Sequence, residues 1–309
     1  MRHSEESDTR EVLDRLREAR RRASSALVEP APPTPTDPPT THGRAGRDLT
    51  AAIGVGIGLA LVLVASLLYD IRIFVGLVAL VIGAGMWELA RAVRLSNIRI
   101  PLEPLWVGGA GMMISAWVGG PSALLMAFAL TCGAVFVWRV VEGGGLAAVR
   151  DASTAMFVAA YLPFLASFAV LLARRPDGAW AVLTFVAIVV ASDTGGYIAG
   201  VLFGKHPMSP SISPKKSWEG FAGSITLATA IAIVCAHFAL GLPWWTGVLL
   251  GVLGVLTGTV GDLAESLIKR DLGLKDMGTI LPGHGGIMDR LDSLLVTVPV
   301  IYLVLEAVA

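Results

Sequence analysis

Long apolar runs recur along this chain from residue 49 to its end. Each run covers roughly 17 to 22 residues, the length that a helix needs to cross about 30 Å of hydrocarbon. Strand-like alternation of apolar and polar positions is absent, and a backbone in lipid must satisfy its own hydrogen bonds, so helices are expected. We predict nine membrane-spanning helices, at residues 50–69, 73–92, 104–119, 121–138, 155–173, 179–200, 220–241, 244–261 and 292–308.

The composition agrees with this pattern. Hydrophobic residues make up 54% of the 309 positions and charged residues only 16%, which is more apolar than a soluble domain of this length needs to be. All eight tryptophans fall near the ends of the predicted spans, where an amphipathic ring prefers the headgroup layer. We therefore predict an all-α, polytopic integral membrane protein.

The first 48 residues differ from the rest of the chain. A charged stretch from Arg10 to Arg22 is followed by a proline-rich stretch from Pro30 to Pro39. The charged half could form a short helix on the membrane surface, but a solvated, disordered tail is the favoured interpretation, and the proline-rich half predicts an extended tether. We divide the chain into a polar tail, 1–48, and a multi-spanning membrane domain, 49–309, whose most informative region is 192–293.

The positions of the basic residues predict the orientation. With the N-terminus inside, 21 of the 24 Lys and Arg residues lie on the cytoplasmic side, and only Arg72, Arg174 and Arg175 lie outside. This bias is the one that cytoplasmic loops of membrane proteins carry. We expect a multi-pass protein of the cell (inner or plasma) membrane, with a cytoplasmic N-terminus and two long charged loops facing the cytosol.

The first charged loop follows the predicted span 179–200. Asp193 lies near the end of that span, where an ionisable group is costly without a partner or a function. Lys215 and Lys216 precede the next helix, and lysines beside a helix N-terminus suit a polyphosphate. Obedience to the positive-inside rule explains the lysine pair equally well. Other polar-site candidates in this loop are Ser213, Pro214 and Glu219.

The second charged region combines two carboxylate sites. Asp262, Glu265, Ser266 and Lys269 would share one face of a continuing helix, because they are spaced by three, four and seven residues from the first. Further on, Asp289 and Asp292 flank Arg290 where the last span begins. Carboxylates at the cytoplasmic ends of two helices suit a hard divalent ion that also holds phosphate oxygens, so we predict a Mg²⁺ site.

A turn rich in glycine and proline connects these two sites. Pro282, Gly283, Gly285 and Gly286 surround His284, and no membrane-spanning helix tolerates such a turn. The segment is therefore expected to re-enter or to line a polar cavity. Snorkelling charges and interhelical ion pairs explain the region poorly, because six acidic residues face four basic ones between residues 261 and 293.

The run from Ser266 to Asp292, SLIKRDLGLKDMGTILPGHGGIMDRLD, resembles the long signature of the phosphatidate cytidylyltransferase family. The signature reads S-x-apolar-K-R, four residues, K-D, then P-x-H-G-G-apolar-x-D-R-apolar-D, and the run departs from it at no fixed position. SDTGGY at 192–197 and SPKKSWEG at 213–220 also resemble family elements. The resemblance is close from Asp193 to Asp292 and extends to the earlier spans only by hydropathy.

The resemblance implies that CTP and phosphatidic acid are joined into CDP-diacylglycerol, with release of pyrophosphate and dependence on Mg²⁺. A monovalent cation beside the Mg²⁺ is an additional option. Carried over to this chain, Asp262 and Asp289 are the metal ligands and are catalytic together with Lys269, His284 and Arg290. The implied substrate-binding residues are Asp193, Ser213, Pro214, Lys215, Lys216, Glu219, Ser266, Arg270, Lys275, Asp276 and Asp292.

The predicted partners are the two substrates and membrane lipids, without nucleic acid and with a homodimer as one option. Two alternatives were weighed. The same membrane CTP chemistry could serve another lipid acceptor, as in dolichol kinases or cytidylyltransferases for ether lipids. A transporter with Asp193, Asp262 and Asp289 as ion-coupling groups is disfavoured, because no inverted repeat is visible and the charges gather at one membrane face.

Overall fold

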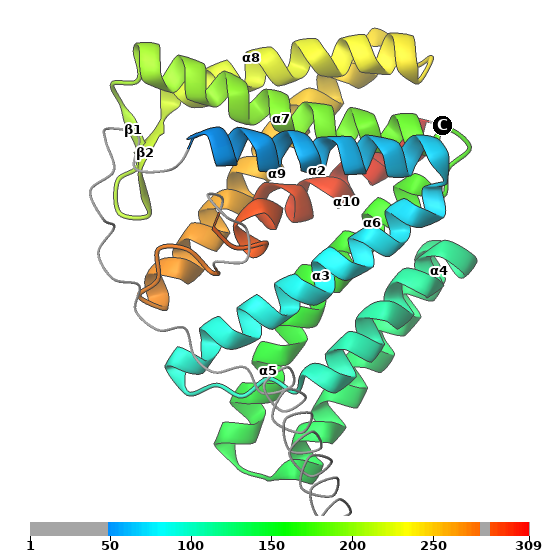
Figure 1. Ribbon diagram of the computed structural model, residues 1–309, viewed down its shortest axis with the longest axis vertical. Coiled ribbons are helices and arrows are strands. Elements are labelled where there is room, and N and C mark those ends of the chain that lie inside the picture. The colour runs from blue at the N-terminus through cyan, green and yellow to red at the C-terminus, as the bar shows by residue number, and fades with distance from the viewer. Residues whose placement is uncertain (1–48, 279–284, 309) are drawn as a thin grey trace, which may run out of the picture.

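The computed structural model describes residues 49–278 and 285–308, and over these residues the protein is almost entirely helical (Figure 1). The elements of the first half are α2 (Leu49–Tyr69), α3 (Ile71–Val93), the 3₁₀ turn η1 (Arg94–Ser96), α4 (Leu102–Glu142), α5 (Leu146–Ala159), the π-helical turn η2 (Ala160–Phe164) and α6 (Leu165–Ala173). The all-α prediction is confirmed.

The second half contains the regions that the sequence singled out. Its elements are α7 (Gly178–Phe203), β1 (Pro207–Ser209), β2 (Ser213–Ser217), α8 (Trp218–Val234), the π-helical turn η3 (Cys235–Ala239), α9 (Trp244–Asp271) and α10 (Met288–Val308). The charged stretch before α8, expected to be a loop, instead forms the antiparallel hairpin β1–β2. Helix α9 runs ten residues past its predicted end, and α10 begins four residues before its predicted start, because polar residues continue both helices beyond their apolar runs.

Seven helices within the described residues are long and apolar enough to cross a membrane. The predicted spans 104–119 and 121–138 both lie in α4, which has non-helical backbone at Gly120 (φ 73°), just before Pro121. A Cβ added at Gly108 would collide with the side chain of Thr131, so the two halves of α4 fold back against each other. Helix α2 is not among these seven, because its apolar stretch from Gly56 to Tyr69 is too short to be counted as a span. The number nine therefore stays a prediction.

Helices α7 and α8 run side by side (Figure 1) and pack through glycines. A Cβ added at Gly195 of α7 would lie 2.5 Å from the carbonyl oxygen of Gly223 in α8, and one at Gly196 would lie 2.5 Å from Oγ of Ser224. Small residues at such positions let the helix backbones approach closely. This packing brings the hairpin that joins α7 to α8 over the ends of both helices.

Helices α9 and α10 make a similarly close contact. Gly261 of α9 lies against the backbone carbonyl of Asp292 in α10, where an added Cβ would collide with the carbonyl oxygen. Because Asp262 follows Gly261 directly, this contact fixes the spacing between Asp262 and the first turns of α10.

Replacing Gly261 with Ala is expected to lower the melting temperature of the protein in detergent, since backbone atoms cannot move aside as a flexible side chain can. Gly133→Ala in α4 is the matched control, because an added Cβ there meets nothing within 4 Å. In a thermal denaturation series, Gly133→Ala should melt at or slightly above the wild-type temperature, because Ala favours a helix more than Gly does. Equal melting temperatures for the two variants would show that α9 and α10 are packed less tightly than described.

Candidate functional site

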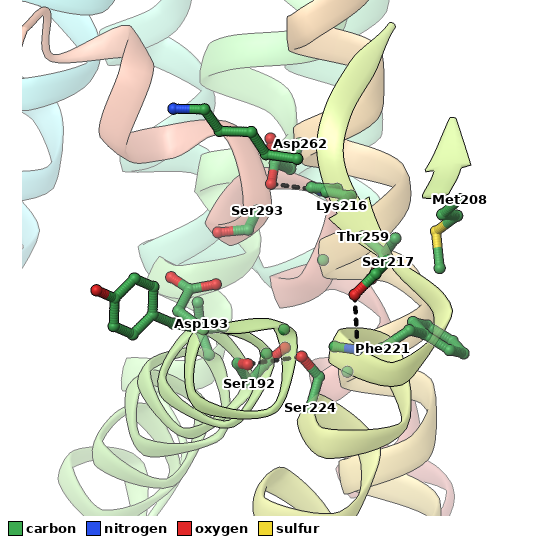
Figure 2. A pocket seen from close by; sticks show the side chains of 18 residues that line it. Ser192, Asp193, Met208, Lys216, Ser217, Phe221, Ser224, Thr259, Asp262 and Ser293 are labelled. Atoms are coloured by element: carbon green, nitrogen blue, oxygen red, sulfur yellow. Dashed lines mark hydrogen bonds and ion pairs between the residues drawn. The ribbon is translucent and has the colours of Figure 1, made fainter. Parts of the chain in front are cut away.

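Two neighbouring cavities are lined by many of the charged residues that the sequence analysis singled out. The smaller, of about 250 Å³, lies beneath β2 and between α7, α8 and α9, and is here named the hairpin cavity (Figure 2). The larger, of about 590 Å³, extends into the helix bundle and is named the bundle cavity. Both are lined by Val189, Asp193, Asp262 and Ser293, so the cavities share a wall.

The hairpin cavity has a cationic side and an anionic side. Lys215 and Lys216 of β2 line it, and the ammonium of Lys216 pairs with the carboxylate of Asp262 on α9 (Figure 2). Ser217 begins helix α8 as its N-cap, and its hydroxyl oxygen accepts a hydrogen bond from the N–H of Gly220 at 3.1 Å. The helix N-terminus and two lysines thus face one small space, an arrangement that attracts an anion.

The hairpin is held in place from outside the cavity. The carboxylate of Glu219 accepts hydrogen bonds from the backbone N–H groups of Lys205 (3.1 Å) and His206 (3.2 Å), and it pairs with the ring of His206. On the other side, Nε of Arg270 donates to the backbone carbonyl of Ile212. Glu219 and Arg270, both predicted to bind substrate, therefore contact the hairpin in this structure and line neither cavity.

The bundle cavity is apolar at one end and charged at the other. Its apolar wall comes from α2, α3, α6 and α7, with residues such as Leu63, Phe74 and Val186. Its charged wall comes mainly from α9, α10 and the segment between them, with one residue from α7, and comprises Asp193, Asp262, Lys269, Asp276, Asp289, Arg290 and Asp292. A cavity of this kind suits an amphipathic ligand with a polar head.

Asp289 is deeply embedded at the charged end. Its carboxylate accepts hydrogen bonds from the N–H groups of Met277 (3.0 Å) and Gly286 (2.8 Å), and Nζ of Lys269 donates to it at 3.0 Å. Lys269 also donates to Glu265 at 3.0 Å, and Glu265 is fully buried. Lys269 therefore bridges two buried carboxylates, one from its own helix and one from α10.

The structure brings together the two carboxylates that were predicted to bind a metal, because Asp262 and Asp289 line the same cavity. Each pairs with a lysine ammonium, Asp262 with Lys216 and Asp289 with Lys269. Carboxylate oxygens are hard ligands of the kind that Mg²⁺ prefers. Both carboxylates already face a positive charge here, so they fit Mg²⁺ chemically. Among the described residues, however, no three His, Cys, Asp or Glu side chains are arranged to hold a metal by themselves.

The remaining predicted residues divide into three groups. Asp193 lies inside α7, ten residues before the helix ends, and faces both cavities, while Asp276, Arg290 and Asp292 face the bundle cavity. His284 lies outside the described residues. Besides Glu219 and Arg270, four predicted substrate-binding residues line neither cavity, and their roles stay predictions: Ser213, Pro214, Ser266 and Lys275.

Sequence reasoning missed two features of the site. Ser293 and Thr259 line the hairpin cavity, but a lone hydroxyl residue gives no distinctive sequence signal. Glu88 of α3 is 1% exposed and accepts a hydrogen bond from the N–H of Met288 at 2.9 Å, beside Asp289. The sequence did contain a signal for Glu88, because an acidic residue within an apolar span is costly unless it has a partner or a function.

Comparisons with known proteins identify the family of the chain. The Cytidylyltransferase family profile matches residues 50–308. A phosphatidate cytidylyltransferase of Mycobacterium leprae is 47% identical over 267 residues, covering 82% of this chain and 86% of that protein. One of Mycobacterium bovis is 43% identical over 289 residues, covering 90% and 94%, and one of Synechocystis is 32% identical over 287 residues, covering 83% and 94%.

The matched residues include the charged region and the apolar helices around it. They therefore include the residues that line the two cavities. The chain belongs to the cytidylyltransferase family.

Proposed function

We propose that this protein transfers the cytidylyl group of CTP to phosphatidic acid, giving CDP-diacylglycerol and pyrophosphate. The observation that carries the proposal is the wall shared by the two cavities, at Asp193, Asp262 and Ser293. One cavity is small and has two lysines on one side, and the other combines an apolar wall with a charged end. Relatives that match most of the chain are named phosphatidate cytidylyltransferase.

The hairpin cavity is the proposed site for the triphosphate of CTP. Lys215 and Lys216 supply two point charges, and the N-terminus of α8 adds its partial positive charge. The bundle cavity is the proposed site for phosphatidic acid, with acyl chains along its apolar wall and the phosphate at the charged end beside Arg290. The two phosphate groups would then meet at the shared wall.

The reaction requires alignment and neutralisation of charge more than proton transfer. A phosphate oxygen of the lipid attacks the α-phosphorus of CTP, the bond from that phosphorus to the bridging oxygen breaks, and pyrophosphate leaves. The lipid phosphate is already largely ionised near pH 7, since its second pKa is about 6, so no general base is needed. The residues of the site position two anions that repel each other, which is the main task in such transfers.

Asp262 and Asp289 are the residues that we propose hold Mg²⁺. When bound, Mg²⁺ supplies charge neutralisation and polarises phosphate oxygens. Lys216 and Lys269 balance the two carboxylates in the described state, and together they carry the same charge as one divalent ion. With Asp262 and Asp289 neutralised otherwise, the ammonium of Lys216 is released, and that of Lys269 keeps only its contact with Glu265, so both can donate to phosphate oxygens. Substrate phosphates would complete the ligand set, since the described residues do not supply a full one.

We further propose that both cavities open toward the cytoplasm, where CTP is found, and that the N-terminus lies on the same side. The excess of Lys and Arg in the segments on that side supports this orientation. A cysteine placed at Ser211, in the hairpin, should resist a membrane-impermeant reagent added to intact cells. Labelling by this reagent would place the hairpin outside the cell and reverse the proposed orientation.

The acceptor is tested with purified protein in detergent, given CTP and Mg²⁺. Pyrophosphate release should depend on phosphatidic acid and should be absent with diacylglycerol or dolichol, because these lack the attacking phosphate. Release with dolichol or diacylglycerol alone would overturn the proposed acceptor.

Replacing Lys215 with Ala is expected to lower kcat/KM for CTP at least about tenfold, because a charge-assisted contact to phosphate contributes on the order of 1.5 to 3 kcal/mol. Lys216→Ala should lower it further, since that change also leaves Asp262 without its partner. Lys205→Ala is the control, an exposed lysine near the hairpin that lines neither cavity. Wild-type kinetics in both cavity variants would leave the two lysines with a role in topology alone.

A further inference from the structure

Glu88 connects the first half of the protein to the segment that holds Asp289. It lies in α3, and its carboxylate accepts the N–H of Met288, the first residue of α10 and a position 200 residues away in sequence. Its side chain is buried, with 1% exposure. Desolvating a carboxylate is costly, so a buried one needs a compensating role.

Two glycines leave room for the side chain of Glu88. A Cβ added at Gly278 would collide with Oε1 of Glu88, and one added at Gly286 would lie 2.7 Å from Oε2. The same Cβ at Gly286 would lie 3.0 Å from Oδ2 of Asp289. Glycines at these two positions therefore let two carboxylates from different helices contact one segment of backbone.

The hydrogen bonds divide between the two carboxylates. Asp289 accepts the N–H groups of Met277 and Gly286, and Glu88 accepts the N–H of Met288. The first N–H groups of a helix have no partner within the helix and are commonly satisfied by a side-chain oxygen just before it. Gly286 and Ile287 precede Met288 and carry no such oxygen, so Glu88 supplies the acceptor from another helix.

We propose that Glu88 is a positioning residue for Asp289: by accepting the N–H of Met288, it fixes the start of α10 and thereby the direction of the Asp289 carboxylate into the bundle cavity. The inference rests on the proposed function, in which Asp289 holds Mg²⁺. It requires an oxygen acceptor at residue 88 and does not require a negative charge there.

Two substitutions separate these requirements. Glu88→Gln keeps a carbonyl oxygen for the N–H of Met288 and should retain most of the activity. Glu88→Ala removes the acceptor, and the half-saturating Mg²⁺ concentration should rise about 10- to 100-fold, the usual effect of losing a group that orients a metal ligand. Glu103→Ala, in the first turn of α4 and outside both cavities, is the matched control.

The Mg²⁺ dependence also distinguishes positioning from a loss of folded protein. A smaller folded fraction lowers the rate equally at every Mg²⁺ concentration, whereas a misdirected Asp289 changes the concentration that is required. Binding of Mn²⁺ in the presence of CTP, followed by electron paramagnetic resonance, provides a readout without turnover. Glu88→Ala should weaken Mn²⁺ binding, and Glu88→Gln should not.

The contact itself is tested by a double-mutant cycle in thermal stability, which does not depend on catalysis. Gly278→Ala should be strongly destabilising in the wild-type background, because its Cβ meets Glu88, and much less so in the Glu88→Ala background. Additive effects would overturn the contact. Equal impairment by Gln and Ala at residue 88 would overturn the positioning role in favour of a charge requirement. The wild-type protein could lack cytidylyl transfer while the double-mutant cycle still shows coupling between residues 88 and 278. That result would refute the proposed function and leave the contact standing.

Discussion

Asp262→Asn is expected to lower the rate of CDP-diacylglycerol formation by several orders of magnitude while the protein still inserts and folds. Asn keeps the shape of Asp and one oxygen ligand, but it removes the charge that holds a hard cation. Asp262 is the clearer of the two proposed metal ligands to test, because its described partner is a single side chain, Lys216. Part of the lost activity should return as Mg²⁺ is raised.

Asp289→Asn should cause an equally large loss, but with a structural component. Both backbone N–H groups donate to Oδ2 of Asp289, and Nζ of Lys269 donates to Oδ1. Asn has a single acceptor oxygen, so its NH2 group must face either the two N–H groups or the ammonium, and neither can accept a hydrogen bond from it. Asp292→Asn should do less damage if that residue only orients its neighbours. The control is Asp271→Asn at the end of α9, an exposed position outside both cavities.

Pyrophosphate release measured against Mg²⁺ concentration separates these variants. Near-normal rates and an unchanged Mg²⁺ dependence for Asp262→Asn and Asp289→Asn would show that the carboxylates are structural and that the proposed metal site is wrong.

Lys269→Met is expected to abolish activity and also to destabilise the protein. The ammonium of Lys269 bridges Glu265 and Asp289, whose side chains are 0% and 5% exposed. Removing one partner from a buried ionic group leaves uncompensated charge and typically costs about 3 to 5 kcal/mol. The melting temperature in detergent should therefore fall clearly below that of the wild type.

A second substitution separates the two effects. Adding Glu265→Gln to Lys269→Met removes one of the two stranded charges, so the double variant should regain part of the lost melting temperature. Activity should not return, because Asp289 remains without its cation and the ammonium proposed to contact phosphate is absent. Recovery of activity together with stability would assign Lys269 a purely structural role.

The sequence predicted the helical architecture well, because a long apolar run in a membrane has few alternatives to a helix. It failed at polar helix ends. Hydropathy placed the end of one span just before Asp262, whereas α9 continues to Asp271, since a helix can leave the hydrocarbon without ending. The break at Gly120 within α4 coincides with the boundary between the predicted spans 104–119 and 121–138.

The candidate site was predictable where its residues share a local motif. Spacing indicated that Asp262 and Lys269 share a helix face, and both the carboxylates at the start of the last span and the family resemblance indicated Asp289. Contacts between distant segments were not predictable in this way. The ion pair of Lys216 with Asp262 joins the hairpin to α9, and the hydrogen bond from Met288 to Glu88 spans 200 residues. The periodicity of a single sequence gives no information about such contacts between distant segments.

Tracing each phosphorus of CTP tests the central claim most directly. Purified protein is given phosphatidic acid, Mg²⁺ and CTP labelled at either the α- or the γ-phosphorus, with Asp262→Asn as the inactive reference. Our account predicts that α-label enters the lipid product in a one-to-one ratio with pyrophosphate released, and that γ-label appears only in pyrophosphate. Transfer of γ-label to lipid, or pyrophosphate release without α-label in lipid, would contradict it.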